Sequence, residues 1–155
     1  MTKTSLMLCA SLALAGCASS AAVSQPAPNG PSNVVAFWGP TLGAEKQELY
    51  PNQCQSGGRH AFEGADVFDD RTKEVLVLRF VMDPLEGPVV RLFKDSDTGP
   101  SVVFRKADCT TFTYEFGGTG NNVNFVDEVK VALQLDCRGS KGDSVVGSVD
   151  LPACL

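Results

Sequence analysis

Alternation of apolar and polar residues is the feature of this chain that most restricts its fold. Every second residue from Val129 to Leu135 is apolar, and the residues between them are mostly polar. Phe112, Tyr114 and Phe116 alternate with polar residues in the same way. A period of two places such side chains on one face of a β-strand. Residues rich in Gly, Pro, Asn and Asp interrupt the chain every eight to twelve residues. The pattern therefore predicts an all-β domain of short antiparallel strands.

We expect about eight strands, arranged as an antiparallel β-sandwich that is either immunoglobulin-like or jelly-roll-like. One sequence leaves the strand order open. The almost continuously apolar residues 74–82 predict a central strand with both faces covered. Residues 43–50 form the one segment with helical preference, and residues 117–122 are expected to be a loop. The predicted strands are 34–38, 59–68, 74–82, 88–94, 101–106, 109–117, 126–137 and 144–151.

Composition excludes several classes of protein. The 155 residues are 43% hydrophobic and 20% charged, which is typical of one globular domain rather than a disordered chain. The net charge of −5 argues against a nucleic-acid partner, because phosphates require a basic face. A single histidine disfavours most zinc sites and histidine-based catalysis. Six cysteines are too few for a disulfide-dense scaffold, so an apolar core must stabilise the fold.

The N-terminus has the features of a bacterial secretion signal. Lys3 supplies a positive charge, and an apolar run of about ten residues follows at positions 6–15. A membrane-spanning helix needs about 20 apolar residues, so this run is too short to be one. The run ends in Leu14-Ala15-Gly16-Cys17, which resembles the lipobox of bacterial lipoproteins. The alternative is an ordinary signal peptide that is cut after a nearby small residue such as Ala18.

The resemblance implies that residues 1–16 are a lipoprotein signal peptide and that Cys17 is lipidated. Diacylglycerol would be attached to the sulfur, and an acyl chain to the amino group freed by cleavage after Gly16. A membrane would then be a partner through the lipid. Ala18, in the place where an acidic residue would signal inner-membrane retention, implies the outer membrane. The chain loosely resembles small envelope lipoproteins with a disulfide-bearing β-domain, a resemblance that implies no activity.

The remaining chain divides into a tether and a domain. Residues 17–33 are rich in Ala, Ser, Pro and Gly and contain no charge, which indicates a flexible tether. Residues 34–155 form the predicted β-sandwich domain. Lys3 is the only charged residue before Cys17, so cleavage leaves 12 basic and 18 acidic side chains, a net charge of −6.

Four cysteines remain for the domain, and an even number in an exported domain predicts two disulfides with three possible pairings. We prefer Cys109–Cys137 with Cys54–Cys154, because a hairpin of residues 109–119 and 127–137 brings Cys109 opposite Cys137. Simple alternation places Cys109 on the face away from Phe112, so this pairing requires a β-bulge. A tetrathiolate metal site is the alternative, but the spacings contain no CxxC element.

Two groups of acidic residues are candidate metal or catalytic sites. Asp95 and Asp97 have the spacing of calcium loops, but glycine and lysine occupy later positions where ligands are required. An ordinary hairpin turn is therefore the preferred interpretation of this segment, with calcium as the weaker one. Asp66, Asp69 and Asp70 are interpreted as a solvated strand end rather than a site.

No other pattern predicts catalysis. The sequence lacks the common nucleophile, metalloprotease and phosphate-binding motifs. His60 follows Ser56 by four residues but is interpreted as a surface histidine beside a flexible turn, and Trp38 as a core or edge residue. We therefore expect a non-enzymatic binding or structural module without a cofactor, whose partner is an envelope protein or glycan. A carboxylate-based envelope hydrolase is the alternative, which a deep cleft with two close carboxylates would favour.

Overall fold

The computed structural model describes residues 33–71, 76–94 and 101–155. Two predictions fall outside these residues. They are the lipobox with its tether, including Cys17, and the Asp95–Asp97 turn. Among the described residues, no helix is both long and apolar enough to cross a bilayer.

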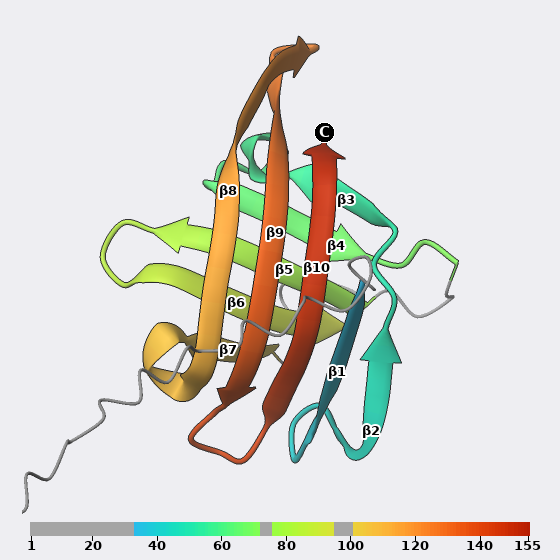
Figure 1. Cartoon of the computed structure of the whole chain (residues 1–155), viewed down its shortest axis with the longest axis vertical. Coiled ribbons are helices and arrows are strands. Elements are labelled where there is room, and N and C mark those ends of the chain that lie inside the picture. The colour runs from blue at the N-terminus through green and yellow to red at the C-terminus, as the bar shows by residue number, and fades with distance from the viewer. Residues whose placement is uncertain (1–32, 72–75, 95–100) are drawn as a thin grey trace, which may run out of the picture.

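The domain is an antiparallel β-sandwich, as predicted, and its described residues form ten strands rather than eight. One sheet has the order β3-β4-β5-β6-β7, which is a simple meander. The other has the order β2-β1-β10-β9-β8, in which the hairpin of β1 and β2 lies beside the meander of β8, β9 and β10. Strands β8, β9 and β10 cross β4, β5 and β6 at a steep angle (Figure 1). The strands are β1 Val34–Gly39, β2 Gly43–Leu49, β3 Gln53–Ser56, β4 Gly64–Phe68, β5 Leu76–Asp83, β6 Gly87–Lys94, β7 Ser101–Arg105, β8 Cys109–Val123, β9 Val126–Arg138 and β10 Ser144–Cys154.

The core lies between the two sheets and is built from the alternating apolar residues. Leu78 and Phe80 of β5 and Val90 and Leu92 of β6 are fully buried on one side. They face the inner side chains of the other sheet, which include Val35, Phe37, Val131, Leu133, Leu135, Val145 and Val149. At about 25 cal/mol for each Å² of apolar surface removed from water, this burial is the main stabilising contribution.

Strand β5 is the central strand of its sheet, as predicted, but only its inner face is fully covered. Leu76, Leu78 and Phe80 are buried on its inner face, whereas Val77 and Arg79 on the outer face are half-buried. The guanidinium group of Arg79 lies between the rings of Phe62 and Phe93, 4.5 and 5.1 Å from their centroids.

Two local predictions about the first half of the domain are wrong. Residues 43–50 are not helical, because β2 pairs with β1 and buries Leu49 in the core. Such a short helix is marginal in water, so sheet pairing overrides its propensity. The predicted strand 59–68 is a strand only from Gly64 onward. Arg59 and His60 instead end a 3-10 helix, η1 (Gly57–His60), which follows the unpredicted strand β3, and residues 61–63 form a turn.

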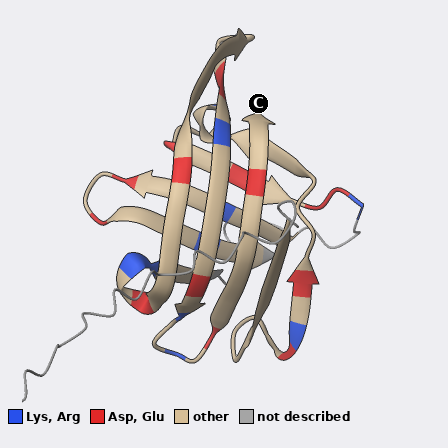
Figure 2. Ribbon diagram, in the orientation of Figure 1, with Lys and Arg blue, Asp and Glu red and all other residues tan. Residues whose placement is uncertain are grey.

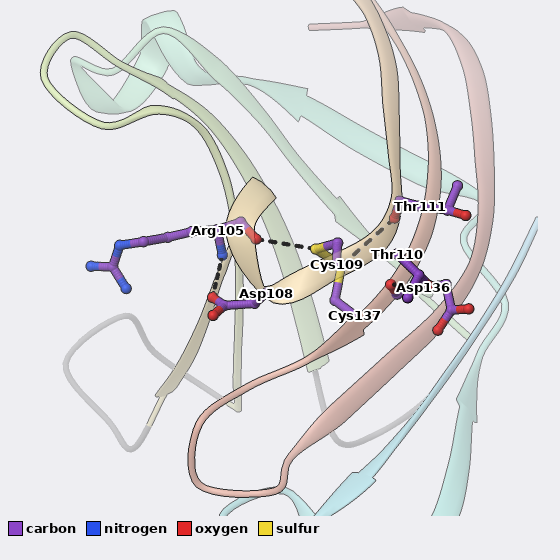
Figure 3. Close-up of a disulfide and its surroundings, with 7 residues drawn as sticks. All are labelled: Arg105, Asp108, Cys109, Thr110, Thr111, Asp136 and Cys137. Atoms are coloured by element: carbon purple, nitrogen blue, oxygen red, sulfur yellow. Dashed lines mark hydrogen bonds between the residues drawn. A yellow bond between two sulfur atoms is a disulfide. The ribbon is translucent and has the colours of Figure 1, made fainter.

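Both predicted disulfides are present. Cys109–Cys137 joins neighbouring strands β8 and β9 at the corner formed by η2 (Lys106–Asp108), which Figure 3 shows in close-up. The required bulge is also present, because Cys109 pairs with Cys137 whereas Thr111 pairs with Asp136. Thr110 is the extra residue, and its hydroxyl donates a hydrogen bond of 3.2 Å to the Asp136 carbonyl. The bulge moves Cys109 onto the face of Phe112.

Cys54–Cys154 joins β3 of one sheet to the end of β10 in the other, across a sequence separation of 100 residues. In the chain-entropy account, a disulfide that closes so long a loop stabilises the folded state by about 4–5 kcal/mol, because it restricts the unfolded chain.

Asp143 connects two turns at the opposite end of the sandwich. Its side chain is 1% exposed, and Oδ1 accepts hydrogen bonds from the backbone N–H groups of Thr41 (2.8 Å) and Leu42 (3.2 Å). Its backbone carbonyl accepts another from Gly139. Gly39 has φ +138°, and a Cβ there would lie 2.4 Å from the Asp143 Cα. The carboxylate therefore replaces water for two backbone donors of the β1–β2 turn, of which that of Leu42 is buried.

We expect Asp143→Ala to lower the free energy of unfolding by about 2–4 kcal/mol, because both backbone donors lose a charged acceptor. Asp143→Asn retains an acceptor oxygen at the same place and should lower it by about 1 kcal/mol. Urea denaturation of the three proteins provides the measurement. Equal losses of unfolding free energy in the two variants would contradict the role of the Asp143 Oδ1 atom as the acceptor of these hydrogen bonds.

Candidate functional site

The hairpin of β8 and β9 extends beyond the rest of the sandwich (Figure 1). Val123 pairs with Val126, so the connecting loop contains only Asn124 and Phe125. Both have positive φ, 51° and 65° respectively, which is characteristic of a type I′ turn. Asn124 suits the first position. The second position normally holds glycine, and here it holds a phenylalanine.

Phe125 is completely exposed, at 101%. A left-handed backbone conformation costs a residue with a side chain about 1–2 kcal/mol relative to glycine. Burial cannot offset this cost, because the ring contacts solvent on all sides. Half of the exposed large hydrophobic side chains in the described part of the chain belong to this hairpin, namely Tyr114, Val123 and Phe125. Strand β8 is also the edge of its sheet, so the hairpin offers both apolar groups and an open strand edge.

A second bulge lies just below the tip. Gly118 pairs with Val129 and Asn122 with Asp127, so residues 119–121 lie opposite Glu128 alone. The Glu128 Oε1 atom accepts hydrogen bonds from the Thr119 hydroxyl (2.6 Å) and the Asn121 amide (2.9 Å). These two bonds hold the pKa of Glu128 below its usual value, Thr119 having the larger effect. Glu128 is therefore an ionised residue that fixes the shape of the bulge.

A pocket of about 400 Å³ lies between the hairpin and the segment from Ser56 to Gly64. We call it the tip pocket. Its apolar lining residues include Phe62, Phe116, Val126 and Val129, and the fully exposed Phe125 stands at its rim. Its charged lining residues are all acidic, namely Glu63, Asp127 and Glu128. The outer part of the hairpin, beyond Lys130, likewise contains acidic but no basic residues (Figure 2).

In the acidic group of Asp66, Asp69 and Asp70, two carboxylates are buried and Asp70 is exposed. Asp66 is 6% exposed and binds Arg79 through two hydrogen bonds of 2.7 and 2.9 Å. Asp69 is also buried and binds Arg71. Asp70 binds Asn52 instead. The interpretation of this group as a solvated strand end therefore fits Asp70 but is wrong for Asp66 and Asp69, whose carboxylates are buried in separate ion pairs.

Ser56 and His60, four residues apart in the sequence, differ in exposure and in their partners. Ser56 is buried, and its hydroxyl accepts a bond from the Gly58 N–H at the start of η1. His60 lies exposed at the end of η1, its ring centroid 6.4 Å from that of Phe62. Among the described residues, no three His, Cys, Asp or Glu side chains converge on a point that could hold a metal ion.

The carboxylates whose pKa departs from its usual value all depart downward. Hydrogen bonds from Tyr50 lower the pKa of Glu48, those from Arg71 lower that of Asp69, and those from the Glu86 and Leu85 N–H groups lower that of Asp83. Glu128 behaves in the same way. A carboxylic acid that donates a proton in catalysis requires the opposite shift. These groups are suited to fixed negative charge.

Comparison of the chain with known protein families, curated protein sequences and solved structures found no match.

Sequence reasoning did not identify the hairpin tip. The segment from Gly117 to Asn122 was interpreted as a loop, whereas it continues β8 almost to the tip. The available signal was Val-Asn-Phe-Val at positions 123–126, a short turn between apolar residues. The phenylalanine in place of glycine concealed it, because two-residue turns are recognised by Asn-Gly.

We expect Phe125→Gly to raise the free energy of unfolding by about 1 kcal/mol, because it relieves the left-handed conformation and removes no buried contact. Thermal and urea unfolding of the variant and parent provide the comparison. A variant less stable than the parent would show that the ring packs against the domain, and the description of Phe125 as an outward-facing group would then be wrong.

Proposed function

We propose that this protein is a lipid-anchored protein of the bacterial outer membrane, whose β-sandwich is a non-enzymatic binding module. The contact surface in this proposal is the hairpin end, which we define as residues 117–129 together with the tip pocket. The partner is another envelope protein, and the lipid on Cys17 holds the module at the membrane.

Phe125 is the observation that carries this proposal. An aromatic ring buries about 150–250 Å² when it is covered, and aromatic residues contribute disproportionately to the binding energy of interfaces. Phe125 combines full exposure with an unfavourable backbone conformation, two features that a purely structural turn has no reason to combine. Residues held in strained conformations concentrate at functional sites. A partner that covers the ring would supply the burial that the isolated domain lacks.

The acidic residues support a binding role over the alternative of a carboxylate-based hydrolase. Asp127 and Glu128 are sequence neighbours on β9, so their side chains leave opposite faces of the strand. The pKa of Glu128 is lowered, which favours fixed charge over proton donation. The open strand edge and the exposed apolar tip are both features of recognition surfaces.

The anchor in this proposal derives from the lipobox-like residues Leu14 to Cys17. One acyl chain binds a membrane only marginally, whereas the three chains of a processed lipoprotein give stable attachment.

Photocrosslinking in intact cells tests the contact surface. A benzophenone-bearing residue in place of Phe125 should yield a covalent adduct with one discrete envelope protein, because the ring lies in the proposed interface. The same residue in place of Leu85 is the matched control, since Leu85 is 94% exposed at the tip of a different hairpin. Equal adducts from both positions, or none from position 125, would refute this contact surface.

Cys17→Ser tests the anchor. The variant should remain an unprocessed precursor without lipid and should leave the detergent phase in a phase-partition experiment, because the thiol that receives diacylglycerol is gone. Cys9→Ser, a change within the same apolar run, is the control and should be processed as the parent is. Detergent partitioning of the Cys17 variant at the parental level would contradict the lipobox interpretation.

A further inference from the structure

The tip pocket combines apolar walls with uncompensated negative charge. Within the described chain, Asp127 lies on the strand face of Val129, and its carboxylate accepts a hydrogen bond of 2.9 Å from the Asn122 amide. This donor is neutral, so it leaves the charge of Asp127 in place. The Glu128 side chain leaves the opposite face of the strand and adds negative charge beside the pocket rather than inside it. Behind the wall, Arg79 stacks on Phe62, but its guanidinium is paired with Asp66. The exposed Arg59 of η1 does not line the pocket.

The apolar part of the lining suits the stem of a long side chain. A volume of about 400 Å³ is near the lower end of the roughly 300–1,000 Å³ of small-ligand sites. Phe116 is half-buried in the lining with its ring 5.5 Å from that of Phe80, and Phe125 stands at the rim. Aromatic faces attract cations as well as apolar groups. Lysine and arginine side chains bury their methylenes against apolar surface while the charge remains near carboxylates.

Gly118 supplies an independent observation. It lies in an extended strand without positive φ, and a Cβ there would approach nothing closer than the Glu128 carbonyl at 3.9 Å. Nothing within the described chain therefore requires glycine, which weakens a strand by about 0.5–1 kcal/mol. Gly118 lines the tip pocket. Glycine in a strand often marks a place where another molecule approaches the backbone closely.

We propose that the tip pocket receives a lysine or arginine side chain from an extended basic segment of the partner protein, while Phe125 packs beside that segment. This inference rests on the proposed function and adds the chemistry of the partner. The complementarity of charge points to a cation, and the exposed ring with the open edge of β8 points to a polypeptide rather than a free amine. Negative charge at the hairpin end also disfavours contact with phosphate headgroups.

Two glycine variants test whether the pocket itself binds. In Gly118→Val the new side chain enters the pocket, because Gly118 is on the face of Val129. Gly117→Val is the matched control. It changes the neighbouring residue on the opposite face, that of Lys130, where a Cβ would meet nothing within 4 Å. Both variants should fold at least as stably as the parent, since valine favours strands.

The probes are five pools of octapeptides, randomised except at one central position that is fixed as Lys, Arg, Gln, Glu or norleucine. Binding to the full-length protein in detergent is measured by fluorescence anisotropy. We expect the Lys and Arg pools to bind about tenfold more tightly than the Gln, Glu and norleucine pools. Gly118→Val should lower the affinity for the Lys pool at least about tenfold, and Gly117→Val should change that affinity less than about twofold.

A double variant tests the charge directly. Glu63→Gln combined with Asp127→Asn should weaken the Lys pool by about tenfold and reduce its sensitivity to salt, because two partly exposed ion pairs are lost. Three results would each overturn the inference. They are equal affinity for the norleucine and Lys pools, equal loss of Lys-pool affinity in the two glycine variants, and parental affinity for the Lys pool in the double variant. Displacement of the Lys pool by spermidine at equal concentration would also overturn it, since the ligand would then be a free amine.

The same measurements separate this inference from the proposed function. If the crosslink from position 125 forms and is unaffected by Gly118→Val, the hairpin end binds a partner but the pocket does not take its side chain. If position 125 forms no crosslink and no pool binds, both the contact surface and the inference fail together.

Discussion

The disulfide between Cys54 and Cys154 is the constraint on which the hairpin end depends. It joins β3, the edge strand of one sheet, to the end of β10, the middle strand of the other sheet. Ser56 lines the tip pocket two residues after Cys54, and Cys154 pairs with Val129, which lines the pocket from the opposite wall. One covalent bond therefore holds both walls at a fixed separation. Without it, only the packing of two crossing sheets would set that distance.

The structure divides into a well-stabilised body and an end that lacks such stabilisation. In the body, alternating apolar residues are buried, Asp143 satisfies the buried turn and each disulfide joins neighbouring strands or sheets. At the hairpin end, Phe125 is exposed in a left-handed conformation, and Gly118 occupies a strand that would accept a larger residue. By general propensity both features lower the stability of the fold. A rigid body that presents such an end is the arrangement expected of a recognition surface.

Sequence reasoning succeeded where the signal was a local pattern of residues or a small number of possible cysteine pairings. Period-two patterns located most of the central strands, and pairing Cys109 with Cys137 required a bulge that the structure has at Thr110. It failed where tertiary contacts decide. Residues 43–50 have helical preference, but pairing of β2 with β1 outweighs it, and β3 is too short to show a period. The tip pocket joins Glu63 to Asp127, residues far apart in the sequence, so no local pattern could bring them together.

The charge of the hairpin end constrains how the proposed anchor and the proposed contact surface could work together. Phosphate headgroups repel carboxylates over a distance of about 8 Å at physiological ionic strength. For a domain anchored through Cys17 as proposed, this repulsion would favour orientations in which the acidic end points away from the membrane. On that arrangement the lipid would supply location, and repulsion by the membrane would leave the tip pocket open to a basic partner.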